Sequence, residues 1–198
     1  RSLRDWSSDV CSSDLHLGDR DGANPIAEVI RAIEVCDKIV IARINGRVLA
    51  GGLGLVAACD LAYAADIAEF GLPEVRVGLF PAMVAAKLLA KIPPAHLQEM
   101  AYLGTPINAV EAERIGIINR TVPFAELDSL VDDVLARLRQ NAPGAISAGK
   151  AALLEMRTML PGERLAFAEG IIATISKSNE AEEGRAAFAE KRKPFWVA

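Results

Sequence analysis

The residues best suited to chemistry lie in the stretch from 48 to 74. A glycine-dense turn at 50–54, Ala-Gly-Gly-Leu-Gly, leads into a short apolar run, and a single carboxylate, Glu74, follows the turn at 70–73. Glycine has no Cβ, so its backbone can approach a ligand closely, and the amides at the start of a helix are unpaired and suit an anion. We therefore expect Gly51 to offer its N–H to an oxygen that becomes negative during a reaction, and Glu74 to move the proton.

Helical and strand-like patterns alternate around these residues. The apolar run Gly52–Cys59 predicts a helix, and Leu61–Ala64 and Ala68–Phe70 predict short strands. The β-branched run Lys38–Ile44 is typical of a buried strand. Apolar spacing, proline and capping signals predict the flanking elements, which are helices at 25–36, 81–91 and 95–102, a short helix capped by Asn108 and ended by Gly116, and a strand at 117–122.

The pattern changes after Pro123. Four helices are predicted there, at 124–140, 143–159, 162–176 and 180–191. The sequence therefore predicts an α/β part followed by a helical part.

Four pieces of the sequence resemble the crotonase superfamily, that of the enoyl-CoA hydratases and isomerases. They are IARING at 41–46, AGGLGLVAACDLAYAADIAEFGLPEVRVGLFP at 50–81, GTPINAVEAERIGIINRTVP at 104–123 and EGRAAFAEKRKP at 183–194. One such piece would be a weak signal, because glycine pairs occur in many loops. Four in family order, with the right separations, indicate the family, although they say less about a particular substrate.

The resemblance implies an α/β fold of the ClpP/crotonase type. Such a fold has a spiral core of repeated ββα turns, here incomplete at its N-terminal end, and a C-terminal helical region used in trimer packing. The implied division is a truncated core at 16–123 and a helical trimerisation region at 124–198. The implied assembly is a homotrimer or a dimer of trimers.

The resemblance also assigns roles at the site. Gly51 supplies one of two N–H donors to the thioester oxygen of an acyl-CoA substrate, and Glu74 exchanges the proton. Donors preorganised in this way stabilise an enolate-like transition state more than the ground state. Members with two glutamates carry the first where this chain has Gly54. The implied substrate contacts are Leu49, Gly52, Pro73, Phe80 and Met83. For the last two, ordinary packing in the core is an open alternative.

The second N–H donor falls in an unusual segment. In the family it comes from a loop of the form Ala-Gly-x-Asp-Leu, whose place is held here by Cys-Ser-Ser-Asp-Leu at 11–15, so Ser13 would serve only if its backbone followed the same path. Residues 1–15 repeat Ser-Ser-Asp without a helical or strand period, and 5–15 match the translation of a common sequencing-library adapter. We therefore expect 1–15 to be a non-native segment joined to a truncated gene; a divergent N-terminal arm is the alternative.

A single carboxylate leaves several functions open. We expect hydration of a 2-enoyl-CoA, because some single-glutamate members of the family are thought to hydrate. A 3-enoyl/2-enoyl-CoA double-bond isomerase also needs just one proton carrier. A truncated acyl-CoA-binding fragment without activity is the third possibility. A nucleotide-phosphate binder is disfavoured, since the sequence has neither GxxxxGK[ST] nor a strand-GxGxxG-helix unit.

The composition of the chain disfavours several classes of binding partner and cofactor. The chain has 198 residues, 52% apolar and 24% charged, as in a soluble globular protein, and its net charge of −4 disfavours non-specific nucleic-acid binding. The longest apolar run is too short to cross a bilayer. The 3 cysteines are scattered, which argues against a disulfide framework or a zinc site and favours a reducing compartment, taken as the cytoplasm. No metal or redox cofactor is expected, since coenzyme A is part of the substrate.

Overall fold

The computed structural model describes residues 25–197. They form two compact units, one of residues 25–34 and 40–131 and the other of residues 35–39 and 132–197. The first unit contains the strands of the described chain and the residues around Gly51 and Glu74. The segment 1–15 that we predicted to be non-native, with Ser13, lies outside the described residues.

The strands of the first unit form two small sheets. One is parallel throughout and consists, in spatial order, of β1 (Ile41–Ile44), β3 (Leu61–Ala65) and β6 (Arg120–Val122). The other consists of β2 (Val48–Leu49), β4 (Glu69–Gly71) and β5 (Ile107–Asn108), with β2 parallel and β5 antiparallel to the central β4. The first four strands thus alternate between the two sheets along the chain, whereas β4 and β5 pair within one sheet.

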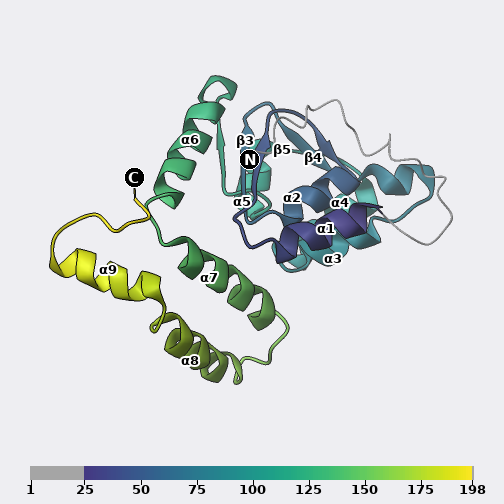
Figure 1. The fold of residues 1–198 in the computed structure, drawn as a ribbon. Coiled ribbons are helices and arrows are strands. Elements are labelled where there is room, and N and C mark those ends of the chain that lie inside the picture. The colour runs from purple at the N-terminus through teal and green to yellow at the C-terminus, as the bar shows by residue number, and fades with distance from the viewer. Residues whose placement is uncertain (1–24, 198) are drawn as a thin grey trace. The chain divides into compact units, whose positions relative to one another are not determined.

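Helices separate the strand pairs. They are α1 (Pro25–Val35) before β1, α2 (Gly51–Ala58) after β2, the 3-10 helix η2 (Pro73–Val77) with α3 (Ala82–Leu88) and α4 (Pro94–Leu103) after β4, and α5 (Ala109–Ile115) after β5. Figure 1 shows α1 to α4 gathered beside the strands. The first unit therefore contains the strand–strand–helix order twice, starting at β1 and at β3, whereas α5 separates β5 from β6.

Helix α2 is poorly supported by its own sequence. It reads GGLGLVAA, and each glycine in a helix interior costs about 1 kcal/mol relative to alanine. Burial offsets this cost, because Leu53, Val56 and Ala57 belong to the apolar core and α2 packs against α3. The core holds α2 in place more than helix propensity does.

A glycine allows β2 and β4 to pair closely. Leu49 lies opposite Gly71, and the Ala50 N–H donates to the Gly71 carbonyl at 3.0 Å. A Cβ on Gly71 would lie 3.1 Å from Leu49 Cδ2 and 3.3 Å from Pro106. A side chain at position 71 would therefore push apart the segments that meet there.

The predicted strand at 117–122 is wrong in its first half, because β6 begins at Arg120. Gly116 ends α5 with φ of 91°, and the Ile117 N–H donates to the Ala112 carbonyl at 2.9 Å. This N–H completes the end of α5 and is not available to a sheet. The cap at the other end of α5 is as predicted, since Asn108 Oδ1 accepts from the Glu111 N–H at 2.9 Å.

The second unit is helical. After a 3-10 turn η3 (Phe124–Glu126) in the first unit come α6 (Leu127–Leu138), whose later part lies in the second unit, α7 (Pro143–Met156), α8 (Arg164–Ile175) and α9 (Asn179–Ala189). Helices follow Pro123 through the described chain, as predicted, although a division into domains at that residue stays a prediction. Among residues 25–197, no helix is both long and apolar enough to span a membrane.

Candidate active site

The pairing of β2 with β4 determines where the predicted site lies. The two strands are parallel, with Leu49 opposite Gly71, so both segments leave the sheet at the same edge. Gly51 comes two residues after Leu49, and Glu74 comes three residues after Gly71. The structure therefore brings Gly51 and Glu74 to one edge of this sheet.

The orientation of the Gly51 N–H depends on Ala50. The Ala50 carbonyl accepts from the Leu53 N–H at 2.9 Å, and the Ala50 N–H donates to Gly71. Because the peptide unit is planar, fixing the Ala50 carbonyl also fixes the Gly51 N–H on the opposite side of the same unit. Gly51 is the first residue of α2, so this N–H has no acceptor within the helix.

Ala50 adopts a strained backbone conformation. Its φ is 51° and its ψ is −129°, a combination that suits glycine better than alanine. Such conformations cost about 1–3 kcal/mol and are found where the surrounding structure imposes them. Sequence reasoning missed this residue, because an alanine gives no signal that its φ is positive.

Glu74 is the second residue of η2, which the sequence analysis did not predict. The helix begins at Pro73 and ends before Gly78, whose φ is 79°. Proline at the first position and glycine just past the last is the signal that could have revealed it. Because η2 follows β4 directly, Glu74 lies at the same edge of the sheet as Gly51.

The Glu74 carboxyl group is partly desolvated. The residue is half-buried, and its Oε2 is completely buried without a hydrogen-bond partner among residues 25–197. Burial raises the pKa of Glu74, and a hydrogen bond to its own backbone opposes this in part. A buried unsatisfied oxygen costs about 1–3 kcal/mol, and a carboxyl with a raised pKa is suited to proton exchange.

Position 54 is closed by apolar side chains. A Cβ on Gly54 would lie 3.2 Å from Ile30 Cδ1 and 3.3 Å from Val84 Cγ2. Both side chains are 3% exposed and come from α1 and α3. A side chain that starts at position 54 would therefore have to displace Ile30 and Val84, and no motif in the sequence signalled this contact of Ile30.

The predicted substrate contacts fall into two groups. Leu49, Gly52 and Pro73 are half-buried residues of the β2–β4 edge and its helices. Phe80 and Met83 are 54% and 40% exposed, so the alternative that they pack in the core is wrong. The Phe80 ring lies 6.3 Å from the ring of Tyr102, at the end of α4. A role in substrate binding stays a prediction for these five residues.

Comparison with known proteins assigns a family to this architecture. The family model described as Enoyl-CoA hydratase/isomerase matches residues 18–198. The chain belongs to this family. It is 39% identical over 165 residues to the carnitinyl-CoA dehydratase of Escherichia coli O157:H7, which covers 81% of this chain and 63% of that protein. The carnitinyl-CoA dehydratase of Salmonella paratyphi A is 37% identical with the same coverage. The chain thus spans 63% of the length of these curated relatives.

Solved structures of enoyl-CoA hydratase/isomerase family members share the fold. The human enoyl Coenzyme A hydratase domain-containing protein 3 matches with a TM-score of 0.83 at 32% identity, covering 86% of this chain and 68% of that one. The enoyl-CoA hydratase of Mycobacterium smegmatis matches with a TM-score of 0.84 at 31% identity, covering 87% and 67%. The predicted crotonase-like α/β fold is confirmed.

The packing at position 54 can be tested by comparing two glycines of α2. Gly54→Glu should lower the free energy of unfolding by about 1–3 kcal/mol or more, because the new side chain must displace Ile30 and Val84 and buries a charge. Gly52→Glu is the matched control, since a Cβ on Gly52 meets nothing within 4 Å. Its stability should change by about 0.5 kcal/mol at most. Denaturant unfolding measures both, and equal stabilities of the two variants would contradict the packing described.

The desolvation of Glu74 predicts a pH-dependent difference in stability between the parent chain and Glu74→Gln. A carboxyl whose pKa is raised on folding favours the folded state below its ordinary value of 4.5 and loses this contribution as the pH rises through its folded pKa. The variant should therefore gain stability relative to the parent between pH 4 and pH 8, as measured by urea unfolding. Glu99→Gln, which removes an exposed carboxylate of α4, controls for the lost charge. A difference that stays constant or shrinks with rising pH would contradict the burial.

Proposed function

We propose that the protein acts on acyl-CoA thioesters, adding water across the double bond of a 2-enoyl-CoA and catalysing the reverse dehydration. The observation that carries the proposal is the Glu74 carboxyl group, with its buried Oε2, at the same sheet edge as the fixed Gly51 N–H. Family membership and the dehydratase name of two relatives support the same reaction. For this chain, the activity and the substrate are proposals.

One glutamate can complete the reaction. In hydration, the Glu74 carboxylate takes a proton from the water that attacks C3, and the electrons of the double bond move onto the thioester oxygen as an enolate. The Gly51 N–H stabilises that oxygen, and losing one such donor typically costs about 10²–10³ in rate. The protonated Glu74 then delivers its proton to C2, which restores the thioester and the carboxylate. The second donor, predicted at Ser13, lies outside the described residues.

Double-bond isomerisation is the second candidate, and the packing at Gly54 favours it. Position 54 carries no carboxylate to position water, and Ile30 and Val84 pack closely against this glycine. Glu74 alone could remove a proton from C2 of a 3-enoyl-CoA and return it to C4, giving the 2-enoyl-CoA through the same enolate. A third candidate, an acyl-CoA-binding fragment without turnover, is separated from both by the kinetic test below.

The helical region also supports a proposed homotrimer or dimer of trimers. Helix α8 reads RLAFAEGIIATI, and none of its residues is buried within the described chain. Leu165 and Ile172 are 72% and 65% exposed and lie two turns apart on one face of α8. A helix this apolar is normally covered, and in the proposed assembly another copy of the chain covers it.

Turnover can be measured by the loss of enoyl-thioester absorbance with crotonyl-CoA. Glu74→Gln should lower kcat by about 10²–10⁴, because the amide cannot carry the proton, while CoA-ester binding changes little. For isomerisation, 3-hexenoyl-CoA replaces crotonyl-CoA and the absorbance rises. Glu69→Gln, on the preceding strand β4, is the control and should keep activity.

Three outcomes separate the candidates. Loss of activity in Glu74→Gln but not in Glu69→Gln supports the enzyme. Binding of CoA esters by the parent without turnover of either substrate supports the fragment. Full activity in Glu74→Gln contradicts the proposed role of this carboxyl group.

The proposed assembly predicts a charge-sensitive helix face. Ile172→Glu should shift the chain from trimer toward monomer in analytical ultracentrifugation, because it places a charge in a contact between copies. Ala166→Glu adds the same charge to an exposed position away from the Leu165–Ile172 face and should leave the assembly unchanged. A monomeric parent chain, or equal effects of both variants, would contradict the role of this face.

A further inference from the structure

The second unit contains a cavity of about 630 Å³ that the proposed chemistry does not use. It is lined by the last turn of α6, the connection to α7, the first turn of α7, residues 37–39 and Trp196. All of these residues belong to the second unit, whereas Gly51 and Glu74 belong to the first. The volume lies within the range of about 300–1,000 Å³ that small-molecule sites occupy.

The cavity has an apolar floor and a fixed aromatic wall. Leu135, Leu138 and Ile146 contribute the apolar lining from α6 and α7. The Trp196 indole Nε1 donates to the Gln140 carbonyl at 3.3 Å, which holds the ring against the α6–α7 connection. Figure 1 shows the chain after α9 turning back toward the end of α6, which brings Trp196 to this place. The Trp196 ring also packs at right angles to the ring of Phe195, with the centroids 5.1 Å apart, so the indole is fixed where it lines the cavity.

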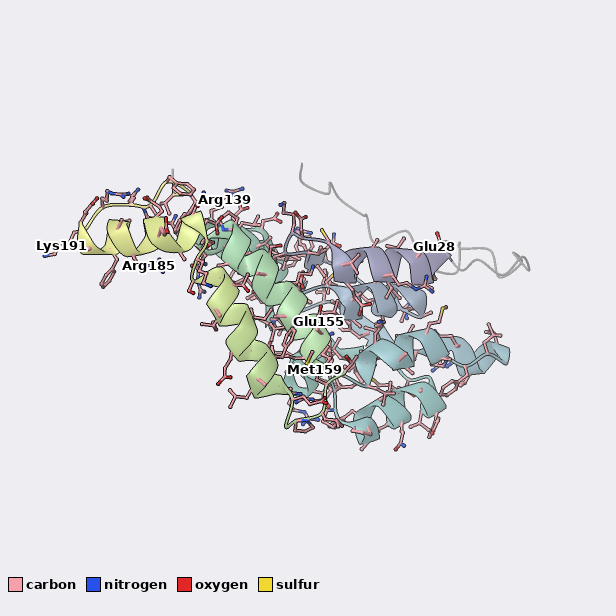
Figure 2. All side chains as sticks on the ribbon, turned by 60° about the horizontal axis from the view of Figure 1, so that its bottom comes forward. Glu28, Arg139, Glu155, Met159, Arg185 and Lys191 are labelled. Carbon is pink, nitrogen blue, oxygen red and sulfur yellow. The ribbon has the colours of Figure 1, made fainter. Side chains whose placement is uncertain are left out.

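Among the described residues, two cations line the cavity, Lys38 and Arg139, and they differ in whether they form an ion pair. Lys38 pairs with Asp37 at 2.8 Å, so these two lining residues largely neutralise each other. Arg139, labelled in Figure 2, follows directly after α6 and makes no ion pair with any residue of 25–197. A guanidinium is suited to bind a carboxylate through two parallel hydrogen bonds.

We infer that this cavity binds an aromatic carboxylate, with the ring between the apolar floor and Trp196 and the carboxylate on Arg139. Lys150, whose Nζ donates to the Lys38 carbonyl at 2.9 Å, adds positive charge beside Asp37 and Lys38, while the carboxylate of Asp37 disfavours a polyphosphate. A single carboxylate on Arg139, which has no ion pair among residues 25–197, therefore fits this lining. The inference does not depend on the proposed acyl-CoA chemistry, because none of the residues involved is used there.

Binding of 1-naphthoate to the full chain tests the inference. In a Trp6→Phe background Trp196 is the remaining tryptophan of the 2 in the sequence, so its fluorescence reports on the cavity. A saturable change is expected, and Arg139→Ala should raise the Kd about fivefold, the effect of losing one partly exposed ion pair. Ala136→Phe, which adds bulk to an exposed lining residue, should abolish the saturable change.

A matched arginine separates a specific site from general charge attraction. Arg157 is exposed, follows α7 and does not line the cavity, so Arg157→Ala should leave the Kd unchanged. Equal weakening by Arg157→Ala and Arg139→Ala would overturn the inference. So would the absence of a saturable Trp196 signal in a background that circular dichroism shows to be folded, or binding that survives Ala136→Phe.

Discussion

The close approach of β2 and β4 at Gly71 is the constraint on which the candidate active site depends. Because Gly71 has no side chain, Leu49 and Pro106 can both pack closely against its backbone. The Gly71 carbonyl accepts a hydrogen bond from the Ala50 N–H. This hydrogen bond holds Ala50 in its strained conformation at the entrance to α2. The same pairing sets the point at which η2 leaves β4 with Glu74. A single glycine thus relates the donor and the proton carrier to each other.

Several features of this region are unfavourable for folding. A glycine-rich helix, an alanine with positive φ and a buried carboxyl oxygen without a partner each lower stability by an amount of the order of 1 kcal/mol. They occur together where β2 and β4 end, next to the buried side chains of Leu53, Phe70 and Leu72, whose packing offsets these costs. Local departures from good folding are expected where a site is held ready for chemistry.

Much of the fold could be predicted from the sequence, because its elements carry local signals. The helical spacing of apolar residues predicted α1 and the later helices, and Asn108 and Gly116 marked the two ends of α5. The strand at 117–122 was placed too early, since a β-branched run does not reveal that the Ile117 N–H is used to end α5.

The candidate site was harder to predict, because its geometry rests on contacts between distant segments. Gly51 and Glu74 could be named from the resemblance, and the β2–β4 register explains why they share an edge. The strain at Ala50 and the packing of Ile30 and Val84 against position 54 depend on contacts that no local pattern encodes. The helix η2, which contains Glu74, did have a local signal in Pro73 and Gly78.

A crystal structure of the chain with acetoacetyl-CoA, whose enolate resembles the proposed intermediate, would test the central claim most directly. We expect the thioester oxygen to lie about 2.7–3.1 Å from the Gly51 nitrogen, with the Glu74 carboxyl group beside the α and β carbons. A bound thioester whose oxygen points away from Gly51, or whose acyl group lies out of reach of Glu74, would contradict it.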